Sequence, residues 1–152
     1  MIENNKFDKS FGPVGTSAGM FLFIAGLILT FFHLAGLILL LIGAFVGFSS
    51  TSTLIDYERK RVKFSNNLFG FIRIGQWVKI EPSMKIGIKE SNLTWRSYSQ
   101  GNRPLDIENK DYRIILLDSV NKEIMPIKKF STNDLAKIEL GTIGHQLGLN
   151  LY

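Results

Sequence analysis

The stretch from residue 18 to residue 48, AGMFLFIAGLILTFFHLAGLILLLIGAFVGF, constrains the fold of this chain more than any other. It contains no Asp, Glu, Lys, Arg, Asn or Gln, and its one strongly polar side chain is His33, near its middle. An uninterrupted apolar run of this length is typical of a segment that lies in a lipid bilayer. The sequence therefore predicts a membrane element first, and says more about where the protein sits than about what it does.

The length of this stretch favours two short helices over one long helix. A single helix over residues 17–50 would be about 51 Å long at about 1.5 Å per residue, whereas the hydrocarbon core is about 30 Å thick. Tilt alone, usually about 0–40°, does not absorb this excess. Helices near residues 17–32 and 35–50 would each be about 24 Å long. We therefore predict a transmembrane helical hairpin over residues 17–50 that turns between His33 and Gly36.

Charged residues beside the hairpin predict its orientation. Lys6 and Lys9 precede it, and the basic cluster Arg59, Lys60, Arg61 and Lys63 follows it. The positive-inside rule places both flanks in the cytoplasm, which requires an even number of spans. We expect a multi-pass protein of the cell inner (cytoplasmic) membrane with both termini cytoplasmic. A signal peptide is disfavoured, because the run far exceeds an h-region of about 7–15 residues and no A-x-A-like cleavage site follows it.

Glycines form a stripe on each half of the predicted hairpin. Small residues on one face let membrane helices approach closely, and two of the glycine pairs have GxxxG spacing. One interpretation is that the stripes pack the two helices together. The other is that one stripe is free to form a homo-oligomer or to bind another membrane subunit. The glycines are Gly15, Gly19 and Gly26 in the first half and Gly36, Gly43 and Gly47 in the second.

The rest of the chain predicts a tail and one α+β domain. Residues 1–16 are polar and glycine-containing, and we expect an irregular tail. Residues 53–152 alternate short β-rich runs with turn signals, beginning with a hairpin at TLIDYERKRVKF, and indicate about six or seven antiparallel strands. Pro126 lacks an amide donor, so its strand is expected at a sheet edge or beside a bulge. A closing helix is expected to begin within residues 131–134 and to end at Gly148, with an apolar face of Leu135, Ile138, Ile143 and Leu147 and with Leu140 at its margin.

This plan resembles small two-span bacterial membrane proteins that carry a pleckstrin-homology-like (PH-like) domain, a family without an assigned function. The resemblance is carried by the apolar hairpin, the TLIDYERKRVKF hairpin, the strand from Gly70 to Trp77 and the closing helix with its Leu-Gly-Leu-Asn-Leu-Tyr end. It implies an antiparallel PH-like sheet or partial barrel, capped by the C-terminal helix and held on the cytoplasmic side. It implies no reaction.

A search for catalytic or cofactor-binding patterns finds none, so we expect a non-enzymatic protein without a cofactor or metal. The chain has no cysteine, and its two histidines, His33 and His145, are predicted in different compartments. No phosphate-binding glycine loop, GxSxG or HExxH motif is present. The acidic run Asp106, Glu108 and Asp111 is interpreted as a solvated loop rather than a divalent-metal site.

The charge of the chain leaves lipid as a candidate ligand and disfavours nucleic acid. The net charge of +5 is moderate, although Trp77, Trp95 and Tyr98 lie among basic residues. The basic cluster either fixes membrane topology only or also contacts anionic lipid head groups, at about 1 kcal/mol per residue. The function we expect is a membrane-anchored interaction module that binds a partner protein or the lipid surface. The alternative is an accessory subunit of a larger membrane complex that assembles through the glycine-striped hairpin.

Overall fold

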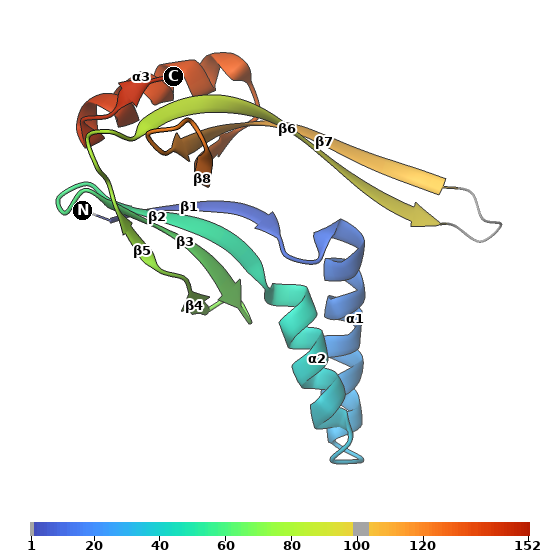
Figure 1. Ribbon diagram of the computed structural model, residues 1–152. Helices are drawn as coiled ribbons and strands as arrows, with labels where there is room; N and C mark the ends of the chain where they lie inside the picture. The colour runs from blue at the N-terminus through green and yellow to red at the C-terminus, as the bar shows by residue number, and fades with distance from the viewer. Residues whose placement is uncertain (1, 99–103) are drawn as a thin grey trace. The chain divides into compact units, whose positions relative to one another are not determined.

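The structure, a computed structural model, describes residues 2–98 and 104–152, except for the side chains of Leu93 and residues 95–109. It is an α+β protein with a helical N-terminal part (Figure 1). Two compact units divide the chain: a hairpin unit of residues 8–51 and 66–74, and a sheet unit of residues 1–7, 52–65 and 75–152. The helices are α1 (Gly12–Thr30), α2 (Gly36–Phe48) and α3 (Asn133–Leu147). The strands are β1 (Ile2–Lys9), β2 (Ser50–Asp56), β3 (Arg61–Leu68), β4 (Ile72–Ile74), β5 (Trp77–Lys79), β6 (Lys85–Tyr98), β7 (Pro104–Leu117), β8 (Glu123–Phe130) and β9 (Asn150–Leu151).

The apolar stretch folds as two helices that lie side by side and run in opposite directions (Figure 1). The turn between them satisfies its own backbone, because the Phe32 amide donates to the Leu29 carbonyl over 3.0 Å and the Gly36 amide to the His33 carbonyl over 2.9 Å. The break therefore falls at His33, as predicted. Helix α1 begins and ends earlier than predicted, whereas α2 begins one residue later and ends two residues earlier. Among the helices that the structure describes, α1, with 19 residues, alone is both long and apolar enough to cross a membrane.

The first sheet has the strand order β1-β2-β3-β4, with β5 also paired to β3. β5 pairs antiparallel with the first half of β3, and β4 pairs antiparallel with the second half. The strand that we expected from Gly70 to Trp77 is thus divided between β4 and β5, with a break that begins at Gly75. A Cβ at Gly75 would overlap the carbonyl group of Phe64, so the chain passes β3 here at a distance that only glycine permits.

The N-terminal segment differs from our expectation of an irregular tail, because Ile2–Lys9 forms strand β1 beside β2. Its inward-facing positions are Glu3, Asn5 and Phe7, which are half-buried. Two of these three side chains are polar, so the strand lacks the alternation of apolar and polar residues that would have revealed it.

The second sheet has the order β8-β7-β6-β9, in which β9 joins β6 in parallel. β6 and β7 form a long antiparallel pair from Lys85 opposite Leu117 to Tyr98 opposite Pro104. The prediction for Pro126 is confirmed, because β8 is the edge strand and its pairing with β7 shifts register twice.

Helix α3 ends at Gly148 in the left-handed conformation (φ 72°), as predicted for its last position. The predicted apolar face is half wrong, because Ile143 and Leu147 are buried but Leu135 and Ile138 are 52% and 69% exposed. The helix instead packs through a stripe spaced four, three and four residues apart, Ala136, Leu140, Ile143 and Leu147. Gly144 lies beside this stripe against Ile86 and Leu151, and its lack of a side chain lets the helix approach the sheet.

The expected antiparallel strands with a C-terminal helix are present, but the sheet unit is not a clear PH-like barrel. Its core is one cluster that includes Ile55, Val62, Ile86, Leu116 and Ile127, contributed by strands of both sheets. Residues 80–84, which contain Pro82, are not part of a strand and separate β5 from β6. β5 belongs to the first sheet and β6 to the second. Among the described residues there are two separate sheets and no closed barrel.

Candidate functional site

The inner face of the helical hairpin consists of glycine. A Cβ at Gly26 would overlap the backbone of Leu40, and one at Gly43 would overlap the backbone of Phe23. Gly19 and Gly47 lie against each other in the same way, and Gly36 lies against the backbone of Thr30 at the turn. Gly15 alone among the six predicted glycines meets a residue of its own first turn, Phe11. Apart from Gly15, both stripes are therefore occupied by the contact between α1 and α2.

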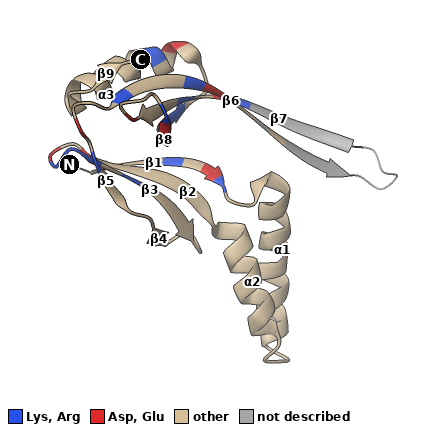
Figure 2. Cartoon of the chain, in the orientation of Figure 1, with Lys and Arg blue, Asp and Glu red and all other residues tan. Residues whose placement is uncertain are grey.

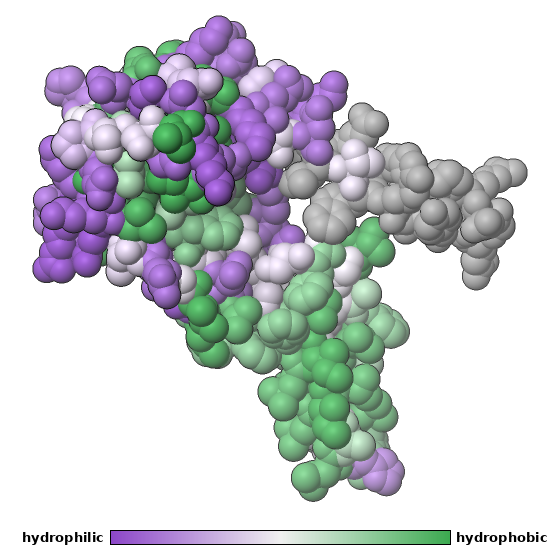
Figure 3. Space-filling view, viewed as in Figure 1, coloured by the Kyte–Doolittle hydropathy of each residue, from purple (hydrophilic) through white to green (hydrophobic). Residues whose placement is uncertain are grey.

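The outer face of the hairpin carries large apolar side chains. Phe21 and Ile38 are 73% and 63% exposed, and the buried positions of both helices are Thr16 and glycines. Figure 3 shows this as a continuous apolar surface over both helices, and Figure 2 shows no charged residue on either. Water-soluble helices bury their large apolar residues, so this arrangement is the reverse of theirs and suits an apolar surrounding medium.

A cluster of phenylalanine rings lies at the end of the hairpin unit where α1 begins and α2 ends. Successive ring centroids from Phe11 to Phe45 to Phe69 to Phe71 are 5.4, 5.5 and 6.4 Å apart. The Phe69 amide also donates a hydrogen bond of 3.3 Å to the Ser49 hydroxyl oxygen, just beyond α2. Sequence reasoning did not single out Phe69 or Phe71, and the only signal was the Phe-Gly-Phe turn at residues 69–71.

The four residues of the predicted basic cluster do not share one surface role. Arg61 forms an ion pair of 2.9 Å with Asp56, and its guanidinium lies 4.4 Å from the ring centre of the half-buried Trp77. Lys60 lies beside Gly148 at the carboxyl end of α3, where a cation is favoured. Arg59 and Lys60 are exposed, whereas Arg61 and Lys63 are half-buried. Burial alone would raise the pKa of Asp56, but the hydrogen bonds from Arg61 and from the Arg59 amide hold it below its ordinary value.

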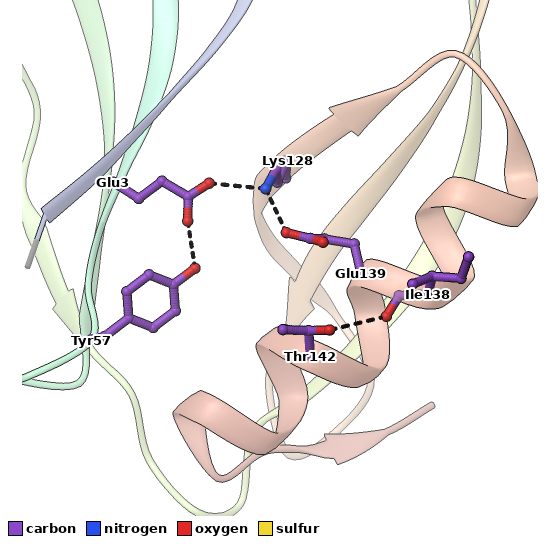
Figure 4. Close-up of polar contacts among 6 residues, drawn as sticks. All are labelled: Glu3, Tyr57, Lys128, Ile138, Glu139 and Thr142. Atoms are coloured by element: carbon purple, nitrogen blue, oxygen red, sulfur yellow. Dashed lines mark hydrogen bonds and ion pairs between the residues drawn. The ribbon is translucent and has the colours of Figure 1, made fainter.

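A second polar cluster, which sequence reasoning missed, lies within the sheet unit (Figure 4). The Lys128 ammonium bridges two carboxylates, at 2.9 Å from Glu3 and 2.5 Å from Glu139. The Tyr57 hydroxyl donates to the other oxygen of Glu3 over 2.6 Å. Glu3 lies on β1, Tyr57 directly after β2, Lys128 on β8 and Glu139 on α3, so the cluster ties four parts of the chain together. A hollow of about 490 Å³ is lined by these four side chains with Thr142 and Gln146.

The electrostatics of this cluster keep Glu3, Lys128 and Tyr57 in their ordinary charge states. Burial would raise the pKa of Glu3, but the Tyr57 hydrogen bond and the Lys128 ammonium lower it below its usual value. Burial would lower the pKa of Lys128, but Glu139 and Glu3 raise it. Burial and the Glu3 carboxylate raise the pKa of Tyr57. Lys128 therefore stays a charged amine and Glu3 a carboxylate, and the geometry of the cluster is that of a structural ion-pair network.

The remaining candidates from the sequence lie apart. His33 is at the hairpin turn, and His145 is exposed on α3. Asp111 is not in a solvated loop as expected: it is 2% exposed on β7 and paired with Arg113 at 2.6 Å and with Lys129 at 3.3 Å. The side chains of Asp106, Glu108, Trp95 and Tyr98 lie outside the described residues. Within the described part of the chain, no group of three His, Asp or Glu side chains is arranged to hold a metal ion.

Comparison of the chain with protein-family models, with curated proteins and with solved structures gives no match. The class of protein is therefore described from its fold alone. That class is an α+β protein with an N-terminal apolar helical hairpin, one helix of which is long and apolar enough to span a membrane.

Proposed function

We propose that the hairpin anchors this protein in a lipid bilayer as two spans and that the sheet unit acts there as a non-enzymatic interaction module. The observation that carries the proposal is the arrangement of side chains on the hairpin, in which glycines lie between the two helices and large apolar side chains are exposed on the outside. Exposed to water, that outer surface would be unfavourable by roughly 25 cal/mol for each Å² of apolar area, whereas a bilayer solvates it.

The orientation follows from the flanking charges. Lys6 and Lys9 before the hairpin and the basic cluster after it favour a bacterial inner membrane with both termini in the cytoplasm. The 19 residues of α1 correspond to about 28 Å and the 13 residues of α2 to about 20 Å. The apolar turn side chains Phe31, Phe32 and Leu34 lengthen the apolar region of the hairpin, and local thinning of the bilayer accommodates the rest.

The packing of the glycines favours the interaction module over the accessory subunit. The subunit alternative needs a free glycine stripe, but the stripes lie between α1 and α2. Within the sheet unit, Arg61 of the basic cluster is held by Asp56 and Trp77, which weakens the case for a lipid head-group site there. Leu135 and Ile138, large apolar residues exposed on α3, favour a partner protein as the ligand of this unit. A helix packed on antiparallel strands supports the PH-like assignment as part of the same proposal.

Alkaline carbonate extraction of membranes from cells that produce the full chain tests the anchor. We expect the protein to stay in the pellet and to be released by detergent. A matched pair of variants adds a control: Ile24→Asp with Ile28→Asp changes the outer face and should release part of the protein, whereas Ile24→Leu with Ile28→Val should not. Recovery of the unaltered chain in the carbonate supernatant would overturn the proposal.

A further inference from the structure

Strands β3 and β4 of the hairpin unit form a short finger, residues 66–74, with an unusual turn. The Phe71 amide donates to the Leu68 carbonyl over 3.2 Å, and the two central residues, Phe69 and Gly70, have φ of 54° and 81°. Positive φ at both central positions defines a type I′ turn, which normally takes Asn-Gly or Gly-Gly. A bulky aromatic residue is disfavoured at the first of these positions.

The contacts of Phe69 explain why this conformation is maintained. Its ring packs against Phe45 of α2 and its amide is bonded to Ser49, so both the side chain and the backbone are fixed to the end of α2. Because the turn is held in this way, the finger has a defined place at the end of the hairpin where α1 begins and α2 ends. That end is where the chain leaves the proposed anchor.

The finger exposes large apolar side chains at its turn and along β4. Phe71, Ile72 and Ile74 are 75%, 43% and 54% exposed, and the exposed cation Arg73 lies among them. Figure 3 shows this apolar patch adjoining the apolar surface of the hairpin. Inside the hairpin unit, the contacting rings of Phe11, Phe45, Phe69 and Phe71 also connect the finger to the ends of α1 and α2.

We propose that the finger is a second membrane contact, which inserts Phe71, Ile72 and Ile74 at the boundary between head groups and acyl chains of the bilayer that holds the hairpin. The inference rests on the proposed anchor. A lipid is favoured over a protein as the occupant, because the patch continues the surface assigned to lipid and lies at the level where the helices end. Aromatic and aliphatic side chains with a basic neighbour are suited to that boundary, where the cation meets lipid phosphate. The finger would fix the depth and rotation of the hairpin.

The absence of cysteine from the chain permits a direct test with single-cysteine variants. Phe71→Cys and Ile28→Cys, each carrying an environment-sensitive nitrobenzoxadiazole label, are reconstituted as full-length protein in vesicles of phosphatidylcholine and phosphatidylglycerol. Quenching by a lipid with a nitroxide near its head group is compared with quenching by aqueous iodide. Ile28 lies on the outer face of α1 and reports on the anchor alone. We expect the lipid nitroxide to quench the label at Phe71 and iodide to leave it largely unquenched.

A matched control separates insertion from folding. Ile72→Asp with Ile74→Asp alters exposed side chains only. Added to Phe71→Cys, these two substitutions should make the label at residue 71 accessible to iodide. Added to Ile28→Cys instead, they should leave the quenching of the label at residue 28 unchanged. If Ile28 is lipid-quenched while Phe71 is quenched by iodide alone, the finger inference is overturned and the anchor stands. If neither label is quenched by lipid, the anchor fails and the finger inference fails with it.

Discussion

At the scale of single residues, glycine has two different uses in this protein, and α3 contains one example of each. Nothing lies within 4 Å of a Cβ built on Gly141, whereas a Cβ on Gly144 would be 3.1 Å from the Leu151 side chain and 3.3 Å from that of the buried Ile86. Gly144 is therefore required for packing, and Gly141 only weakens the helix.

This contrast gives a matched pair of substitutions. Gly141→Ala should raise the free energy of unfolding by about 0.5–1 kcal/mol, because alanine is the better helix former and the space is open. Gly144→Ala should not raise the free energy of unfolding in this way, because the added Cβ would be too close to the side chains of Leu151 and Ile86. Urea unfolding of the sheet unit in the detergent-solubilised chain, followed by tryptophan fluorescence, measures both. Equal stabilisation by the two substitutions would contradict the close packing of α3.

The buried Asp111 makes the stability of the sheet unit depend on acid. Burial would raise its pKa, but the Arg113 guanidinium and the Lys129 ammonium hold it below its ordinary value of 3.8. A carboxylate with a lowered folded-state pKa contributes stability above the unfolded value, and that contribution is lost as the pH falls through the folded-state pKa. Asp111→Asn should therefore destabilise the protein by about 1.5–3 kcal/mol at neutral pH, and the difference should shrink at acidic pH below 3.8. Unfolding curves of both proteins across this range provide the measurement; a difference independent of pH would refute the assignment.

At the scale of elements, the hairpin depends on close contact between two helix backbones. Gly43→Leu places a large side chain on the backbone of Phe23 and should force α1 and α2 apart. Ile42→Leu changes the neighbouring position, which is exposed on the outer face of the hairpin, and is the control. Spin labels on cysteines at Met20 and Ala44 measure the separation by pulsed electron resonance. The Gly43 variant should give a longer and broader distance distribution, and an unchanged distribution would show that the glycine contact does not hold the hairpin.

The elements that the sequence predicts are those whose signal is local. Composition alone predicts the apolar hairpin and its break at His33, and the chemistry of Pro126 and Gly148 predicts an edge strand and a helix end. The missed features depend on residues far apart in the chain. β1 is polar and forms because it extends an existing edge, and the bridge from Glu3 to Lys128 joins the two ends of the sequence. The exposed side of α3 was misassigned because Ala136 and Gly144, both small, turned out to face the core.

At the scale of the whole molecule, the division of the described strands into two sheets explains why no clear PH-like barrel is seen. Local pattern identifies strands, but whether they close into one curved sheet depends on the pairing of distant strands, which the alternation of residues does not encode. The same limit applies to function. The apolar hairpin indicates an environment, whereas a ligand of the sheet unit would be selected by exposed surfaces such as Leu135 and Ile138 of α3.

The proposed two-span topology has the most direct test of the proposals at this scale. Leu34, at the hairpin turn, is 84% exposed, so Leu34→Cys should be available to a thiol reagent at the far interface. Asn4→Cys, exposed on β1, marks the cytoplasmic side. In intact cells, or in spheroplasts if an outer membrane shields the surface, a membrane-impermeant maleimide should label Leu34→Cys and should label Asn4→Cys only after lysis. A hairpin of which α2 covers only about 20 Å could instead enter and leave on one side of the bilayer. In that case Leu34→Cys would stay unlabelled until detergent is added, and the proposed two spans would have to be replaced by a re-entrant hairpin.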